Sequence, residues 1–166
     1  MNDSPQDLPS SLDGTVRPFD DKMRRAHLLI FAAWLFHAAA WFLPIVKGAA
    51  SPNWLPGWEA FRAAFSAVWP YEGINFTGYG AVPATASAVA TILFILGSPL
   101  VVLRGPHSLR ASALAAATAF VVNAHWYVLS GSDRSDLRIG YFLWWFSFLL
   151  LATGLLDLAG PRRDPD

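Results

Sequence analysis

The stretch from residue 26 to residue 46, AHLLIFAAWLFHAAAWFLPIV, decides the fold of this chain. It holds 21 consecutive residues without a Lys, Arg, Asp or Glu. A helix needs about 20 mostly apolar residues to cross a hydrocarbon core roughly 30 Å thick. Backbone groups in lipid must be hydrogen-bonded within their own segment, so a spanning segment of this kind is helical. The stretch therefore predicts a membrane-spanning helix.

Three further apolar runs of similar length predict three more spans. They cover residues 81–103, 109–129 and 139–159. Over the whole chain 54% of residues are hydrophobic and only 14% are charged, whereas a soluble domain has about a quarter charged. The sequence thus predicts an all-α protein, a four-helix transmembrane bundle formed by residues 23–160. Residues 1–22 are expected to be a disordered cytoplasmic tail, and residues 161–166 a second cytoplasmic tail.

The distribution of basic residues predicts the orientation of the bundle. The tails and the link between the second and third spans carry eight basic residues: Arg17, Lys22, Arg24, Arg25, Arg104, Arg110, Arg162 and Arg163. The opposite loops carry four: Lys47, Arg62, Arg134 and Arg138. Cytoplasmic loops are enriched in Lys and Arg, so both termini are expected in the cytoplasm. The first span is expected to stay uncleaved as a signal anchor, because Trp41–Val46 continue the apolar run past Ala38–Ala40.

The loop after the first span contains a short amphipathic helix, expected at residues 56–69. Trp58, Phe61, Phe65 and Val68 recur at helical spacing on one face, with Glu59, Arg62 and Ser66 on the other. Pro56 sets its start and Pro70 its end. It is too short to span a bilayer, so it is expected to lie in the outer interface, where Trp58, Phe61, Phe65 and Trp69 act as an anchor or as a lid for a ligand or partner.

The same loop carries a resemblance. Leu43-Pro44 followed by Leu55-Pro56-Gly57-Trp58 with Ala60-Phe61 resembles uncharacterised small multi-span membrane proteins of bacteria. The resemblance covers about thirty residues, and it implies a bacterial inner (plasma) membrane setting. It implies no activity.

Two polar residues fall inside the predicted spans. His37 lies midway along the first span and Asn123 two-thirds along the third, at similar depth by helical rise. Unpaired polar groups are costly in hydrocarbon, so we expect a hydrogen bond between His37 and Asn123. The alternative is that this pair contacts a ligand.

Other ionisable groups lie nearer the ends of the spans. His27 and Asp157 are expected at the inner surface, where Asp157 neutralises His27 or Arg25. A less favoured alternative is a haem whose iron is held by His37 and His125. By helical rise, His125 lies about 6 Å further out than His37, an awkward offset for two ligands of one iron. The sequence contains no cysteine and suggests no catalytic, metal or cofactor-binding residue, so no cofactor is expected.

Small residues predict the helix packing. Alanines at spacing four in residues 84–90 and 111–119 favour close approach of the second and third spans as a hairpin. Gly97-Ser98-Pro99 is expected to kink the second span. The fourth span is bulky and aromatic, and it is expected to face lipid or a partner.

These features favour a structural or accessory membrane subunit over the other classes of function. Its expected partners are the lipid bilayer and another membrane protein or a second copy of the chain. The alternative is binding or transport of a small hydrophobic molecule or lipid, and an enzyme is disfavoured. The formal net charge is zero, which excludes the basic face that nucleic-acid binding requires.

Overall fold

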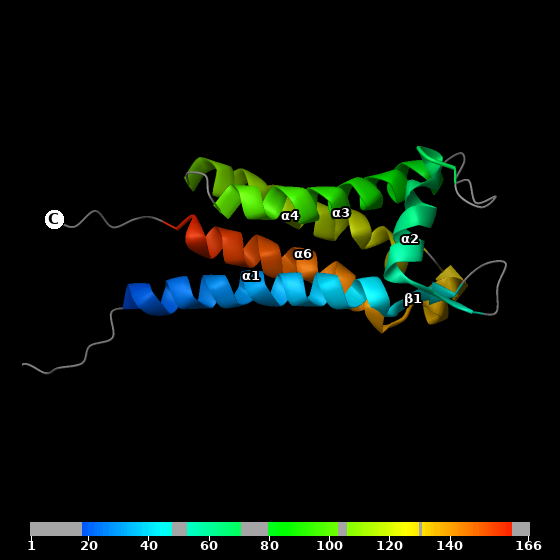
Figure 1. The fold of residues 1–166 in the computed structure, drawn as a ribbon, viewed down its shortest axis with the longest axis horizontal. Coiled ribbons are helices and arrows are strands. Elements are labelled where there is room, and N and C mark those ends of the chain that lie inside the picture. Colours follow the sequence, from blue (N-terminus) through cyan, green and yellow to red (C-terminus); the bar gives the residue numbers. More distant parts are fainter. Residues whose placement is uncertain (1–17, 48–52, 71–79, 103–105, 130, 161–166) are drawn as a thin grey trace, which may run out of the picture.

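In the computed structural model, residues 18–47, 53–70, 80–102, 106–129 and 131–160 are described, and they form a mostly helical molecule. Four long helical segments run side by side, and the short helix α2 lies across one end of them (Figure 1). They are α1 (Pro18–Phe42), α3 (Ala81–Val102), α4 (Pro106–Asn123) continued by α5 (His125–Leu129), and α6 (Ile139–Leu158). The predicted all-α class is confirmed.

Three of these helices are long and apolar enough to cross a membrane: Asp21–Phe42, Ala81–Val101 and Ile139–Leu158. They correspond to the first, second and fourth predicted spans. The third predicted span is divided between α4 and α5, which meet at Ala124.

The two ends of the first helix differ from the prediction. The helix already begins at Pro18, so residues 18–22 are helical rather than part of a disordered tail. Residues 1–17 and 161–166 lie outside the described residues. The helix ends at Phe42 instead of Val46, and the next residues form strand β1 (Pro44–Lys47). Pro44 lacks the N–H that a continuing helix would need, which explains the early end.

Strand β1 pairs with a second short strand, β2 (Trp54–Pro56), in an antiparallel ribbon. This ribbon was not predicted from the sequence. It lies near the start of α6, because Val46 bridges Leu137 and the Arg138 N–H donates to the Ile45 carbonyl at 2.8 Å. Helix α2 (Gly57–Ala64) and the 3-10 turn η1 (Phe65–Ala67) follow directly. We call the end with the ribbon and α2 the cap end, and the opposite end, where α1 begins and α6 finishes, the tail end.

Helix α6 occupies the centre of the bundle. It packs along α1 on one side and α4 on the other, while α1 and α4 hardly touch in the described part of the chain. One side of this helix is therefore buried against its neighbours, and Tyr141 and Phe148 are among the most buried large side chains. Its other side, with Phe146, Leu149 and Leu156, is exposed, so the expectation that the helix faces lipid or a partner stays a prediction for that side.

The contact between α1 and α6 depends on small residues that repeat every seven positions. On α1 they are Ala26, Ala33 and Ala40, and all three are fully buried. On α6 they are Gly140, Ser147 and Gly154, which are also buried. An added Cβ on Gly154 would come within 2.8 Å of Ile30 and 3.0 Å of the Ala26 carbonyl. The two backbones therefore approach closely along the whole seam, which maximises dispersion contacts.

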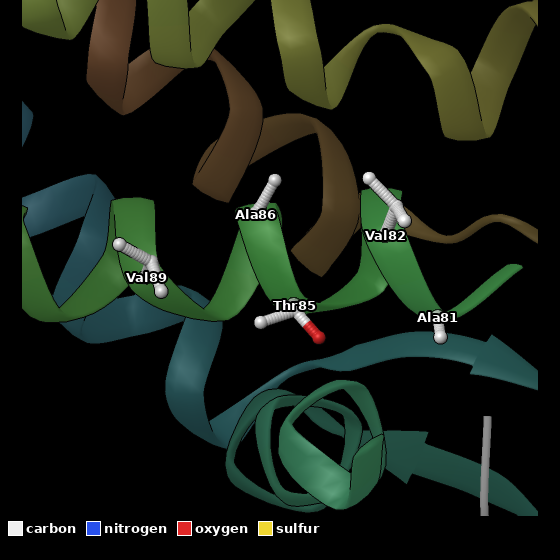
Figure 2. A pocket seen from close by; sticks show the side chains of 5 residues that line it. All are labelled: Ala81, Val82, Thr85, Ala86 and Val89. Carbon is white, nitrogen blue, oxygen red and sulfur yellow. The ribbon is translucent and has the colours of Figure 1, made fainter. Parts of the chain in front are cut away.

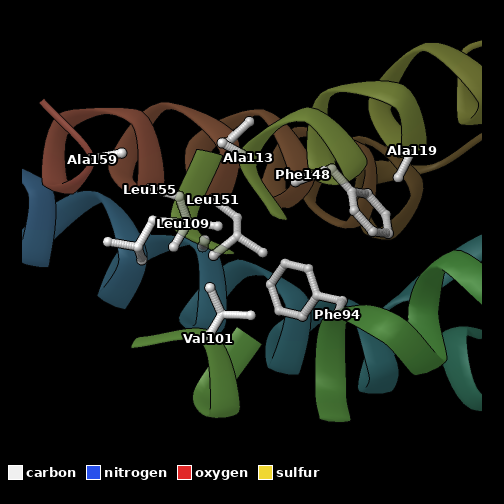
Figure 3. Close-up of a cluster of buried hydrophobic side chains, with 12 residues drawn as sticks. Phe94, Val101, Leu109, Ala113, Ala119, Phe148, Leu151, Leu155 and Ala159 are labelled. Carbon is white, nitrogen blue, oxygen red and sulfur yellow. The ribbon is translucent and has the colours of Figure 1, made fainter. Parts of the chain in front are cut away.

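Larger apolar side chains fill the space between α6, α4 and α3 (Figure 3). Phe94 and Val101 come from α3, Leu109 and Ala113 from α4, and Phe148 from α6. The predicted contact between the second and third spans is confirmed, since α3 packs on α4. Helix α3 is continuous through Pro99, and the Ser98 hydroxyl donates to the Phe94 carbonyl at 2.7 Å. The kink at Gly97-Ser98-Pro99 stays a prediction.

Candidate functional site

His37 is the most distinctive polar residue in the interior of the bundle. It lies on α1 and its side chain is 2% exposed. Its ring stacks on Phe94 of α3 with centroids 4.0 Å apart and planes 9° from parallel, and it meets Phe148 of α6 edge-on at 5.7 Å. The imidazole thus joins three helices.

Hydrogen bonds define which nitrogen of His37 carries the proton. The Ser147 hydroxyl donates its single proton to the Trp144 carbonyl at 2.6 Å. Its oxygen then accepts from His37 Nδ1 at 3.0 Å. In the neutral ring this leaves Nε2 as a lone-pair acceptor. Nε2 is buried and has no hydrogen-bond partner in the described part of the chain.

The predicted hydrogen bond between His37 and Asn123 is not formed. Asn123 is fully buried, but its side-chain Nδ2 donates to the Ala119 carbonyl of its own helix at 2.8 Å. The reason is the central position of α6, which packs between α1 and α4 and so separates the two residues. His37 bonds Ser147, and the Asn123 backbone carbonyl accepts from the Tyr141 hydroxyl at 2.9 Å.

The Tyr141 hydroxyl also explains why α4 stops at Asn123. In a continuous helix the Tyr127 N–H would donate to the Asn123 carbonyl. Instead, the Tyr127 N–H donates to the Ala124 carbonyl at 3.0 Å, and Tyr141 takes the Asn123 carbonyl. A side chain that enters the backbone ladder is an established cause of helix breaks.

Two indole hydrogen bonds tie α3 to the rest of the bundle. Trp144 Nε1 of α6 donates to Thr91 Oγ1 at 3.1 Å, and Trp126 Nε1 of α5 donates to Ser87 Oγ at 3.1 Å. Thr91 in turn donates to the Ser87 carbonyl at 3.1 Å. Sequence reasoning missed these residues, because Ser, Thr and Trp are common in spans and only their i,i+4 spacing on α3 pointed to a shared face.

His125 begins α5 and lies toward the cap end. Its Nδ1 donates to the Val122 carbonyl at 2.6 Å, and its ring contacts Trp126 at 4.5 Å. The two histidines of the haem alternative therefore each use Nδ1 within the protein. Among the described residues there is no group of three or more His, Cys, Asp or Glu side chains placed to hold a metal ion.

The predicted helix of the first loop exists, and its buried residues are small: Gly57, Ala63 and Ser66. Ser66, which helical spacing groups with the polar residues Glu59 and Arg62, is fully buried. An added Cβ on Gly57 would overlap the Ala40 carbonyl and lie 2.8 Å from Trp41 Cα, so α2 rests directly on the backbone of α1.

The four aromatic residues of this segment are consequently turned partly outward. Trp58 is 39% exposed and Trp69 is 73% exposed. Phe61 and Phe65 are half-buried; they stack at 6.1 Å, and Phe61 also meets Trp41 at 5.6 Å. The arrangement combines a close-fitting inner face with an aromatic outer face.

At the tail end, Asp157 pairs with Arg25. Arg25 Nε lies 3.5 Å from Asp157 Oδ2, with the two side chains 69% and 21% exposed. His27 instead bonds the Met23 carbonyl of its own helix through Nδ1 at 2.8 Å. Of the two predicted partners for Asp157, the structure selects Arg25.

The surface of α3 near the cap end carries a shallow apolar hollow. It is lined by Ala81, Val82, Thr85, Ala86 and Val89, all from the first turns of α3 (Figure 2). Further along the same helix, a Cβ added at Gly97 would meet nothing within 4 Å.

Comparison with known proteins found no similar protein. No family model matches the chain, and neither the curated proteins nor the solved structures contain a match.

Proposed function

We propose that the chain is an integral membrane protein that crosses the bilayer four times. The observation that supports this is an inverted distribution of side-chain size. The buried positions of α1 and α4 are mainly alanines, whereas large apolar side chains point outward on every long helix. Among them are Leu28, Phe31 and Leu35 on α1, Val89, Leu93 and Leu96 on α3, Leu114 and Val121 on α4, and Phe146, Leu149 and Leu156 on α6. Large exposed apolar surfaces are unfavourable in water but suit contact with lipid chains.

The third span in this proposal is α4 and α5 together. They run from residue 106 to residue 129, which gives a length of roughly 36 Å at the helical rise. That length exceeds the hydrocarbon thickness of about 30 Å. The break at Ala124 is tolerated there because the Tyr141 hydroxyl pairs with the freed Asn123 carbonyl.

The tail end is proposed to face the cytoplasm of a bacterium, across its inner membrane. The support is the excess of basic residues at that end, including Lys22, Arg24, Arg25 and Arg110. Reporters fused to the two termini test this orientation. Both fusions are expected to report a cytoplasmic position, and reporters on opposite faces would contradict a four-span topology.

Within the membrane, the proposed role is that of an accessory subunit that binds a helix of another membrane protein through α3. The support is the outer surface of α3, where the hollow at Thr85 and Ala86 and the open space beside Gly97 leave room for a second helix. Small residues on an exposed helix face let another helix approach closely, which is the main source of helix association in lipid.

Gly97→Leu tests this role without disturbing the fold. The new side chain meets no atom of the described chain at its Cβ, and Leu is the better helix former. It is expected to remove a co-purifying partner while leaving the melting temperature of the isolated protein unchanged. Leu114→Phe, on the exposed face of α4, is the matched control and is expected to keep the partner. A partner that binds both variants equally would contradict docking on α3.

A second candidate function is the binding of a small hydrophobic molecule that carries a hydroxyl or amide N–H. The observation that favours it is His37 Nε2, a buried acceptor without a partner among the described residues. Unsatisfied buried polar atoms are costly, and a bound donor would remove that cost.

His37→Phe separates this candidate from a purely structural role for His37. Phenylalanine preserves a flat ring against Phe94 but offers no acceptor. Mass spectrometry of small molecules extracted from the purified wild type and variant is the measurement. One molecule enriched in the wild type and absent from the variant would support the candidate, and identical extracts would reject it.

A further inference from the structure

The cap end brings two basic side chains and a tryptophan together from three separate segments. Lys47 ends β1 and Trp54 begins β2, and these two residues are direct partners in the antiparallel ribbon. Directly opposed residues project from the same face, with Cβ atoms about 4.5–5.5 Å apart. Lys47 and Trp54 are therefore neighbours on one face of the ribbon.

Arg138 reaches the same place from the start of α6. The Val46–Leu137 bridge and the bond from the Arg138 N–H to the Ile45 carbonyl hold this segment against β1. The Arg138 guanidinium carbon lies 3.8 Å from the centre of the Trp54 ring, a cation–π contact. The indole thus has one cation stacked on it and a second beside it.

Among the described side chains, no carboxylate neutralises this pair of cations. Neither Lys47 nor Arg138 has an acidic partner within 4.0 Å there, whereas Arg25 and Asp157 form an ion pair at the other end. Asp136 is close to Arg138 in sequence but forms no such pair. Both basic side chains are exposed, so an external anion can reach them.

The position of the three residues relative to the apolar surface indicates what kind of anion fits. Ile139 follows Arg138 directly and is 57% exposed, and it begins the outward apolar stripe that continues with Phe146 and Leu149 along α6. Phe42, at the end of α1, is also exposed. A cationic group at the end of an apolar stripe matches an anionic headgroup joined to an acyl chain.

We propose that Lys47, Trp54 and Arg138 form a binding site for the phosphate group of an anionic phospholipid. Arg138 and Lys47 contact the phosphate oxygens, Trp54 holds the guanidinium in place and lies at headgroup level, and the acyl chain follows the stripe from Ile139 to Phe146. This inference rests on the proposed membrane-spanning arrangement, but it is independent of any partner that docks on α3.

The test is thermal unfolding of the full chain in detergent while phospholipid is titrated in. Phosphatidylglycerol is expected to raise the melting temperature in a saturable way, and phosphatidylcholine with the same chains is expected to raise it much less. Inorganic phosphate at the same concentrations is expected to have little effect, because it lacks the acyl chain. Equal stabilisation by phosphatidylcholine, or by inorganic phosphate, would overturn the proposal.

The variant for this test is Lys47→Gln combined with Arg138→Gln. Each basic residue near a membrane surface contributes about 1 kcal/mol to binding anionic lipid, so the half-saturating concentration should rise roughly thirtyfold. Lys22→Gln combined with Arg24→Gln removes two exposed cations from the tail end and should leave that concentration unchanged. If the double variant does not fold, Lys47→Gln alone keeps every backbone bond of the ribbon and should give a roughly fivefold change. A cap-end variant that binds phosphatidylglycerol as the wild type does would overturn the proposal.

Failure here is distinguishable from failure of the accessory role. The lipid titration uses the isolated chain, whereas the accessory role is judged by whether Gly97→Leu loses a co-purifying protein. The protein could need detergent to stay in solution and still bind no phosphatidylglycerol. That result would rule out the lipid site but would leave the proposed membrane topology intact.

Discussion

The seam between α1 and α6 and the attachment of α3 hold helices together in two different ways. In the proposed membrane arrangement lipid provides no hydrophobic driving force between helices, so both depend on direct contacts. Along the seam, Ala26, Ala33 and Ala40 face small residues of α6, and the two backbones nearly touch. Helix α3 instead connects to α6 and α5 through rings and indole hydrogen bonds, such as Trp144 to Thr91. Close packing is intolerant of added volume, whereas bridging side chains can be replaced at modest cost.

The largest expected effect comes from adding volume to the seam. Gly154→Leu places a side chain where even a Cβ would lie 2.8 Å from Ile30, so the free energy of unfolding should fall by about 3 kcal/mol or more. Unfolding of purified protein in increasing sodium dodecyl sulfate measures it. Gly97→Leu is the control for a glycine in open space, and it should lose no stability. Equal losses for both variants would show that the seam is not tightly packed.

A smaller effect is expected when the polar contact of the seam is removed. Ser147→Ala keeps a small residue between α1 and α6 but leaves His37 Nδ1 without its acceptor. Loss of a partner for a buried donor costs about 1–3 kcal/mol. The same detergent unfolding measures it, and Thr153→Ala, which removes a bond only within exposed α6 surface, should cost less. A Ser147→Ala variant as stable as the wild type would mean that His37 finds another acceptor.

The attachment of α3 should show weaker coupling. Trp144→Phe and Thr91→Val remove the two sides of one hydrogen bond, and their double-mutant cycle isolates its contribution. Such bonds inside membranes contribute roughly 0.6–2 kcal/mol, so the coupling energy should fall within that range. A coupling energy near zero would mean that the bond between Trp144 and Thr91 contributes little to holding α3.

The smallest effect is expected at the tail end, away from both regions. Asp157→Asn removes the ion pair with Arg25, whose side chain is 69% exposed. Exposed pairs typically contribute 0–1 kcal/mol and are weakened by salt. We expect a change in the unfolding free energy at the low end of that range, decreasing as NaCl is added. A loss as large as that of Ser147→Ala would indicate that Asp157 has a further buried role.

Much of the fold follows from the lengths of the apolar runs. The second and fourth predicted spans match α3 and α6 almost residue for residue, and the loop helix expected at 56–69 contains α2 and η1. The arrangement of the helices was harder to predict. Aromatic composition suggested that α6 lies outside, while the recurrence of Gly140, Ser147 and Gly154 at spacing seven was the signal for its central position.

The candidate site was predictable only in part. The sequence placed His37 and Asn123 inside apolar runs, and both side chains are buried, but the hydrogen bond expected between them is not formed. Their hydrogen-bond partners could not be predicted from the sequence, because the depth of a residue along its helix does not indicate which neighbouring helix lies beside it. The short ribbon that places Lys47 beside Trp54 was also missed, since Pro44-Ile45-Val46 reads as the end of an apolar span.

The pairing of α1 with α6 joins the first and last helices of the described part of the chain, and this has a consequence for biosynthesis. In the proposed membrane arrangement, ribosomes deliver α1 to the membrane first, and its complementary surface on α6 emerges only after α3 and α4 have been made. Until then, Ala26, Ala33 and Ala40 would face lipid or a chaperone. A chain truncated before residue 139 would keep this surface uncovered, which makes it a natural substrate for membrane quality control.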